Sequence, residues 1–219
     1  MNSKVPYKIL HTITTIGFIL CVVFILMISV NRTLSLDNWK NDQMIFGDQD
    51  AQVEILLFED ILCEECKNFT LHILPLVEKN YIQTKKAKLI YAPIEVLGNS
   101  DATIGSCYCL YKQNPALAMD FLSEYFLSQD EKEKIKIKNV LNRLEPQLQH
   151  HVTKCLKNFS PQDFLLKNFF ISQRLMDGDI EVPTIFVQGK KLEDVGYKTI
   201  SKAIEEALIE INPNLKKPQ

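Results

Sequence analysis

The sequence has little net charge and no long run of charge of one sign. Lys and Arg number 25 and Asp and Glu number 27, so the formal charge is −2 over 219 residues. A protein that binds nucleic acid through the phosphate backbone carries a basic face, and this balance argues against nucleic acid as a partner. The sequence also lacks internal repeats and low-complexity tracts. One globular domain with an appendage is the expected organisation.

The whole chain has six cysteines. Hydrophobic residues make up 46% of the sequence, which is ample for a real core, so disulfides are not needed to make the domain fold. The cysteines therefore point to chemistry more than to a disulfide-built scaffold.

The amino terminus contains a long apolar run. Lys4 and Lys8 precede residues 9–30, in which the polar members are one histidine, four Thr or Ser residues and one glycine. A helix of this length is roughly 33 Å long, enough to cross a bilayer core. We expect a cytoplasmic tail over 1–8, a transmembrane signal-anchor over 9–30 and a polar linker over 31–46.

A cleaved signal peptide is the alternative to an anchor, because Thr33 and Ser35 are tolerable residues before a cleavage point. A short positive tail with an apolar segment after it usually directs the carboxy-terminal part of a chain across the membrane. The expected location is therefore the bacterial inner membrane, single-pass, with the domain in the periplasm or outside the cell. Disulfides persist in that compartment.

Residues 47–211 are expected to form one α/β domain, with a frayed tail over 212–219. Apolar runs predict a strand over 53–58 and a second strand, parallel to it, over 86–94. A third strand over 182–190 enters a hairpin turn, with 191–193 as the returning edge strand.

Helices fill the rest of the domain, and those between residues 100 and 177 form a helical insertion without strands. Pro75 interrupts the first helix, and proline suits the first turn of three others. The expected helices cover 66–80, 101–112, 115–128, 131–144, 146–157, 161–176 and 197–211.

A C-x-x-C motif follows the first predicted strand at the start of a helix. Free backbone N–H groups and the helix dipole favour a thiolate on Cys63, which makes it a nucleophile. Such a pair also begins many zinc sites, so the motif alone leaves redox and metal chemistry open.

The arrangement resembles the thioredoxin superfamily and, within it, the membrane-anchored bacterial branch of the DsbA-like thiol-disulfide oxidoreductases. Phe58 and Asp60 precede Cys63 as in F-x-D-x-x-C-x-x-C, residues 93–98 resemble the family's proline-containing loop, and 184–190 resemble its T-F-F-x-x-G-K hairpin. The resemblance implies a thioredoxin fold with a helical insertion, here after one transmembrane helix. It implies no cofactor and no metal.

The resemblance also implies roles for residues of this chain. Cys63 is the attacking or attacked sulfur, and Cys66 is the buried resolving one. Pro183 is cis and faces the cysteines, and Val182 offers backbone groups to an extended substrate. The implied substrates are protein thiols and disulfides of extracytoplasmic proteins, with a membrane or soluble redox partner. Oxidase, reductase and isomerase directions all stay open.

Acidic residues surround the motif where oxidising relatives often carry proline with histidine or an aromatic. Glu64 and Glu65 lie between the cysteines and oppose the thiolate, so we expect a weaker oxidant than DsbA. Asp60 and Glu59 are candidates for proton transfer near Cys66, as buried acids are in relatives, although a surface loop carboxylate is the simpler interpretation.

Three further cysteines remain, besides Cys21 in the apolar run. The resemblance implies a structural bridge between Cys109 and Cys155, with Cys107 on the opposite side of the helix. Pairing of Cys107 with Cys155 stays open, as does a set of three buried, reduced cysteines.

Two other classes of function compete with the redox interpretation. A zinc module of Cys63, Cys66, Cys107 and Cys109 is disfavoured because about 40 residues of helix and strand intervene. A copper-handling protein of the same fold would want a histidine near the thiols, such as His72. A catalytically silent, substrate-holding module is the third possibility.

Overall fold

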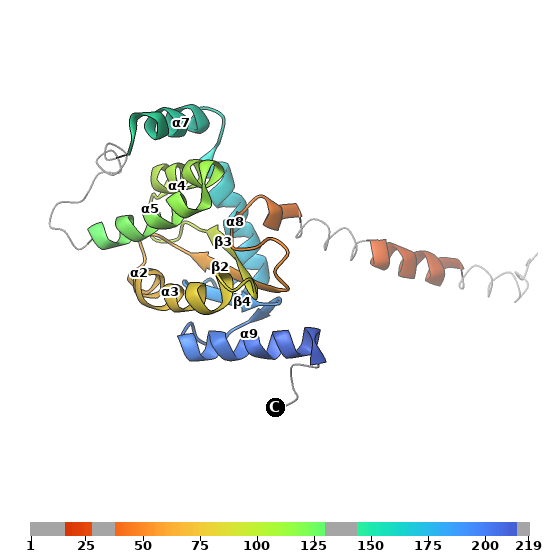
Figure 1. The fold of residues 1–219 in the computed structure, drawn as a ribbon. Helices are drawn as coiled ribbons and strands as arrows, with labels where there is room; N and C mark the ends of the chain where they lie inside the picture. Colours follow the sequence, from red (N-terminus) through yellow and green to blue (C-terminus); the bar gives the residue numbers. More distant parts are fainter. Residues whose placement is uncertain (1–15, 28–37, 130–143, 214–219) are drawn as a thin grey trace, which may run out of the picture. The chain divides into compact units, whose positions relative to one another are not determined.

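The structure, a computed structural model, describes residues 16–27, 38–129 and 144–213 (Figure 1). The chain divides into two compact units, residues 1–42 and 43–219. In the first unit residues 16–27 are helical. No helix in the described part of the chain combines the length and the apolar character needed to cross a membrane. Residues 9–15 and 28–30 of the expected anchor lie outside the described residues.

The second unit is built on a five-stranded mixed sheet in the order β1-β3-β2-β4-β5. β2 (Val53–Glu59) and β3 (Ala87–Pro93) are parallel, as the sequence predicts. β4 (Thr184–Val187) pairs antiparallel with β2 on its other side, and the short edge strand β5 (Lys190–Lys191) completes the hairpin. The sequence predicts the returning strand over 191–193, and in the structure it begins one residue earlier.

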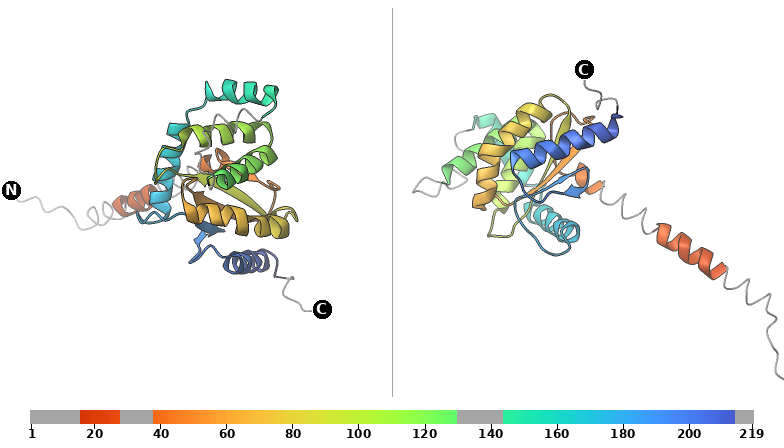
Figure 2. Two further views of the ribbon diagram at one scale, coloured as in Figure 1. Left: turned by 90° about the vertical axis from the view of Figure 1, so that its left-hand side faces the viewer. Right: turned by 90° about the horizontal axis from the view of Figure 1, so that it is seen from below.

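Both faces of this sheet are covered, which is why its central strands are nearly continuous apolar runs. Helices α3 (Leu74–Val77) and α9 (Tyr197–Ile211) lie on one side, and α8 (Pro161–Leu175) lies on the other (Figure 2). α8 is tied to the sheet by Asn168, whose side-chain nitrogen donates to the Pro93 carbonyl at 2.9 Å.

The segment expected as a tether over 31–46 ends inside the domain instead. Its last three residues form β1 (Met44–Phe46), antiparallel to β3 at the edge of the sheet. Met44 and Phe46 are buried, and the Ile45 N–H donates to the hydroxyl of Tyr111 at 3.0 Å. The polar composition of the preceding residues masked a short apolar triplet, which has enough buried surface to join the sheet.

The helix that starts after Cys63 is continuous in direction but not uniform. α2 (Glu64–Asn68) passes into the π-helical turn η1 (Phe69–Ile73), then α3, then a second π-helical turn η2 (Glu78–Ile82). Pro75 lies in the first turn of α3 and has no N–H for the preceding turn. The wider turn of η1 accommodates that missing donor without breaking the helix.

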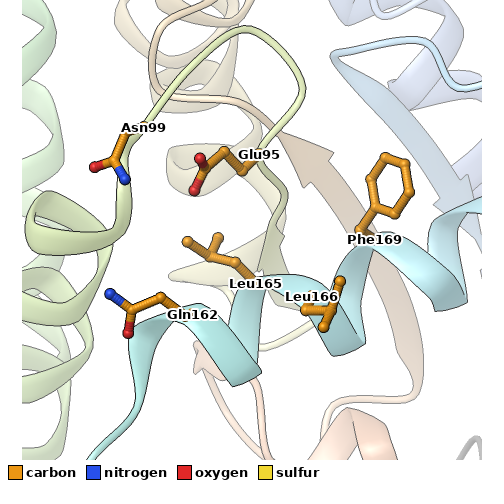
Figure 3. Close-up of a pocket in the computed structure, with 6 residues that line it drawn as sticks. All are labelled: Glu95, Asn99, Gln162, Leu165, Leu166 and Phe169. Atoms are coloured by element: carbon orange, nitrogen blue, oxygen red, sulfur yellow. The ribbon is translucent and has the colours of Figure 1, made fainter.

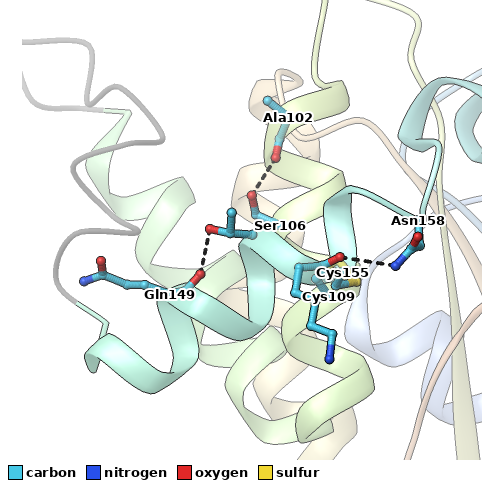
Figure 4. The surroundings of a disulfide bond; sticks show 8 residues. Ala102, Ser106, Cys109, Gln149, Cys155 and Asn158 are labelled. Atoms are coloured by element: carbon cyan, nitrogen blue, oxygen red, sulfur yellow. Dashed lines mark hydrogen bonds between the residues drawn. A yellow bond between two sulfur atoms is a disulfide. The ribbon is translucent and has the colours of Figure 1, made fainter.

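The helical insertion contains α4 (Asp101–Gln113), α5 (Pro115–Ser128), α7 (Pro146–Leu156) and α8 in its described part. The helix expected over 131–144 falls largely on 130–143, outside the described residues. α4 and α7 approach closely enough for a disulfide between Cys109 and Cys155 (Figure 4). Gly105 makes a second close approach possible, because a Cβ there would lie 2.5 Å from Pro161 Cγ.

Candidate active site

The two cysteines of the motif lie at the start of α2, directly after the end of β2. Cys63 is the N-cap residue, with extended backbone angles, and its sulfur accepts the Cys66 N–H at 3.4 Å. Both thiols are free, and the exposed fractions of the two residues are 3% and 0%. The first sulfur therefore faces the positive end of the helix, where a thiolate is favoured.

Two oxygens compete for the single thiol proton of Cys63. Its sulfur lies 3.4 Å from Glu65 Oε2 and 3.5 Å from the carbonyl oxygen of Val182. Burial raises the pKa of the Cys63 thiol, the N–H of Cys66 opposes this shift, and the Glu65 carboxylate adds to it. The sulfur is thus held as a thiol by its immediate acceptors while the helix end favours ionisation.

The two glutamates between the cysteines differ in their surroundings. Glu65 contacts the Cys63 sulfur directly, whereas Glu64 forms an i,i+3 ion pair with Lys67 at 3.8 Å. The side chain of Glu64 is 80% exposed and that of Lys67 only 7%. The sequence suggests that both glutamates oppose the thiolate. In the structure Glu65 alone contacts the Cys63 sulfur. Lys67 pairs with Glu64 and partly screens the charge of that carboxylate.

Cys66 lies deeper, next to a buried acid. Burial raises its pKa most, and the Glu59 charge raises it further. Glu59 is fully buried at the end of β2, and Oε1 accepts the Thr70 hydroxyl at 2.6 Å. Burial raises the pKa of Glu59 to about 8, with the Thr70 bond lowering it. The sequence did not predict the burial of Glu59. A strand that is covered on both faces lacks the alternation of polar and apolar residues that would distinguish buried from exposed positions.

Asp60 does not lie on the surface, and it meets the Cys66 sulfur through its backbone, which lowers the pKa of that thiol, while its carboxylate binds elsewhere. Its carboxylate is fully buried and accepts three backbone N–H groups, from Leu62 at 2.9 Å, Val96 at 2.8 Å and Leu97 at 2.9 Å. It therefore joins the turn before Cys63 to the loop after β3. This geometry explains the aspartate as a structural clamp and leaves Glu59 as the acid beside Cys66.

The peptide bond between Val182 and Pro183 is cis, and it lies beside the cysteines. The register of the sheet places it there, since Phe58 near the end of β2 pairs with Thr184 at the start of β4. The Val182 carbonyl reaches the Cys63 sulfur from this position. The backbone before the proline thus borders the Cys63 sulfur, and the cis bond is the one that the family resemblance implies.

The three cysteines of the helical insertion form no bond with this pair. Cys109 is bonded to Cys155, 46 residues later, and is not available to a four-cysteine zinc site with Cys63. Cys107 is fully buried as a free thiol, with its sulfur 3.8 Å from the Met44 sulfur. The pairing is the one that the family resemblance implies, and α4 carries its two cysteines on different sides.

No group of three or more His, Cys, Asp or Glu residues within the described residues is arranged to hold a metal ion. His72 is exposed on η1, and His150 is exposed on α7. The site itself contains two thiols, a carboxylate at the first sulfur, a buried acid at the second and a backbone carbonyl.

Comparison with known proteins gives a consistent set of matches. Residues 40–206 match the thioredoxin family. The probable disulfide bond formation protein D of Bacillus anthracis is 26% identical over 171 residues, covering 76% of this chain and 78% of the relative. Disulfide bond formation protein D of Bacillus subtilis is also 26% identical, over 179 residues that cover 76% and 77%.

Solved structures resemble the fold. Oxidised BdbD from Bacillus subtilis superposes with a TM-score of 0.63 and 23% identity, over 77% of this chain and 94% of that one. Chlamydia trachomatis DsbA gives a TM-score of 0.64 and 19% identity, over 80% and 94%. At these identities the likeness concerns the fold.

Proposed function

Given that the chain belongs to the thioredoxin family and is a DsbA-like protein disulfide oxidoreductase, we propose that it exchanges thiols and disulfides of extracytoplasmic proteins at Cys63 and Cys66. The observation that carries this proposal is the position of the Cys63 sulfur, at the start of α2 and 3.5 Å from the Val182 carbonyl. A substrate backbone that pairs with Val182 brings its own sulfur to the same place.

The proposed reaction is a pair of exchange steps that balance without a cofactor. The Cys63 thiolate attacks a substrate disulfide, forms a mixed disulfide and releases one substrate thiolate. The Cys66 thiolate then attacks the Cys63 sulfur, closes the Cys63–Cys66 disulfide and releases the second substrate thiolate. The reverse sequence oxidises a substrate dithiol, so the same groups serve either direction.

Glu59 is the group that we assign to the proton of Cys66. The second step requires a thiolate, yet burial and the Glu59 charge both hold the Cys66 thiol protonated. With a pKa of about 8, Glu59 is mostly protonated near neutral pH, and its ionised fraction takes the Cys66 proton and returns it in the reverse step. Glu59 in this role acts on the reacting sulfur, whereas Asp60 only positions the loop.

We place the reduction potential of this pair nearer to thioredoxin's value of about −270 mV than to DsbA's value of about −120 mV. A strong oxidant owes its potential to a stabilised thiolate, and here Glu65 contacts the Cys63 sulfur and opposes ionisation. Lys67 screens Glu64, which limits the effect to one carboxylate. A measured potential above about −150 mV contradicts this placement.

The test of the proposed function is an equilibrium titration of the purified full chain in glutathione or dithiothreitol buffers, read by the mass added on alkylation. We expect one two-electron transition that disappears in Cys63→Ser. A titration that is the same in Cys63→Ser as in the unaltered chain belongs to another pair, such as Cys109–Cys155, and refutes the assignment. No transition at all points to a silent substrate-holding module or to metal handling.

We further propose that the domain is anchored in the bacterial inner membrane and acts in the periplasm or at the cell exterior. The apolar run over 9–30 supports an anchor, and the Cys109–Cys155 disulfide supports an oxidising compartment. Protease digestion of intact spheroplasts tests this, because an external domain is degraded while a cytoplasmic control protein survives. Protection of the domain in intact spheroplasts contradicts the proposed location.

A further inference from the structure

A groove lies between the loop after β3 and helix α8 (Figure 3), and α8 covers the side of the sheet opposite α9 (Figure 2). We propose that this groove receives a segment of the redox substrate polypeptide, with an apolar side chain inside it and a basic residue at its rim. The proposal rests on the function proposed above and specifies which substrate segments that site prefers.

The groove has an apolar wall and a polar rim. Its volume is about 410 Å³, large enough for a leucine-sized or larger side chain. Leu165 is buried beneath it, while Leu166 lines it with 53% of its surface exposed. Figure 3 shows Leu165, Leu166 and Phe169 rising from α8, with Glu95 across from them. An exposed leucine beside such a hollow is a surface that gains stability when it is covered.

The groove is connected to Cys63 through residues that the Asp60 clamp holds. The loop between Glu95 and Asn99, two of the lining residues, contains Val96 and Leu97, whose N–H groups bind Asp60. A Cβ on Gly98 would lie 3.1 Å from Leu62, the residue before Cys63. A polypeptide disulfide-bonded at Cys63 can therefore reach the groove by crossing Leu62 and this loop.

The surface between Cys63 and the groove, formed by Leu62 and the loop after β3, is apolar. Leu62, Val96 and Leu97 are 38%, 43% and 59% exposed, although each is a large hydrophobic residue. Their backbones are fixed by hydrogen bonds to one buried carboxylate, so their side chains stay directed outward at little entropic cost. This crossing favours an extended substrate with few charges between its cysteine and its groove residue.

The charge at the rim of the groove favours a substrate with a basic residue next to its apolar side chain. Glu95 lines the groove, and Glu65 is exposed at the Cys63 sulfur. Gln162, also at the rim, donates to the Asp101 carboxylate, so its amide is already engaged. Lys67, the cation next to the motif, has only 7% of its side chain exposed and faces Glu64. The Glu95 carboxylate at the rim of this apolar hollow is complementary to an apolar side chain with Lys or Arg next to it.

The experiment traps the substrate at Cys63 and compares peptides by equilibrium. The full chain with Cys66→Ala is converted to its glutathione adduct, and single-cysteine peptides displace glutathione. Each peptide carries Leu-Lys, Ser-Lys or Leu-Glu, placed two to five residues from the cysteine on either side. At the productive offset we expect Leu to exceed Ser by about tenfold and Lys to exceed Glu by about threefold in the exchange constant.

Substitutions of groove residues test whether the preferences for Leu over Ser and for Lys over Glu arise in the groove. Leu166→Ser lowers the Leu-to-Ser ratio at least about threefold, and Glu95→Lys reverses the preference between Lys and Glu. Matched changes on α9, Ile211→Ser and Glu210→Lys, leave both ratios unchanged, because these residues lie on the other side of the sheet.

The outcomes separate this proposal from the proposed function. Failure of the Cys66→Ala chain to form a glutathione adduct, together with no redox transition in the unaltered chain, refutes the function itself. Normal adduct formation with equal constants for all peptides overturns the groove alone. Equal constants together with a dimer that Leu166→Ser dissociates assign the groove to a second copy of the chain.

Discussion

Replacing Glu59 by Gln should remove the pH dependence that this buried acid imposes on stability. Burial raises the pKa of Glu59 from 4.5 to about 8, so the native state keeps a proton that the unfolded state loses above pH 4.5. The stability that this proton contributes is complete below pH 4.5 and falls as pH rises towards 8. The slope is about 1.4 kcal/mol per pH unit, so from pH 5 to pH 8 the unaltered chain should lose roughly 4 kcal/mol relative to Glu59→Gln.

The assay is urea unfolding of both reduced proteins at pH 5, 6, 7 and 8, with the difference in unfolding free energy plotted against pH. We expect Glu59→Gln to be no more stable than the unaltered chain at pH 5 and clearly more stable at pH 8. The exposed Glu210→Gln serves as the control and should give a flat difference. A flat difference for Glu59→Gln would show that this carboxyl group titrates alike in the native and unfolded states, and would contradict the raised pKa on which the proposed proton transfer rests.

Three further changes test other parts of the molecule. Glu65→Gln removes the carboxylate at the Cys63 sulfur, which lowers the pKa of that thiol and should raise its alkylation rate by iodoacetamide at pH 7 several-fold. Double replacement of Cys109 and Cys155 by Ser opens a link of sequence separation 46 and should lower the unfolding free energy by about 4 kcal/mol in urea titrations. Gly105→Ala puts a Cβ 2.5 Å from an atom of Pro161 and should lower thermal stability, at a cost of about 1–3 kcal/mol.

Each of these changes has a matched control. Glu64→Gln should alter the alkylation rate less than Glu65→Gln, since Glu64 is exposed and paired with Lys67; an equal effect would mean that the contact with the sulfur has no special weight. Treatment of the double serine variant with dithiothreitol should change its stability little. Gly17→Ala adds a Cβ with no neighbour within 4 Å, so a comparable loss there would undermine the packing explanation for Gly105.

The fold was largely predictable because its signals are local. The apolar runs at β2 and β3, and the prolines that begin α5, α7 and α8, each act within a few residues. β1 escaped prediction because three residues carry little periodicity, and only the free edge of β3 gives them a partner. The π-helical turns around Pro75 likewise depend on how a long helix packs, which spacing does not encode.

The candidate site divides in the same way. Cys63, Cys66 and Pro183 belong to motifs that the sequence displays directly. The difference between Glu64 and Glu65 depends on which way each side chain turns on α2, and the burial of Glu59 depends on layers contributed by distant segments. Asp60 was visible as a motif residue, but its three N–H partners come from two separate loops and emerge only from the folded chain.

The Asp60 clamp holds the loop after β3 by its main chain alone. Since the hydrogen bonds end on the N–H groups of Val96 and Leu97, the identities of those side chains do not enter the clamp. Selection can then exchange the residues at these positions, one by one, without disturbing the geometry of the sulfurs. Substrate specificity can therefore evolve in this loop while the chemistry at the sulfurs stays constant. A library randomised at residues 95–97 should consist mostly of folded proteins.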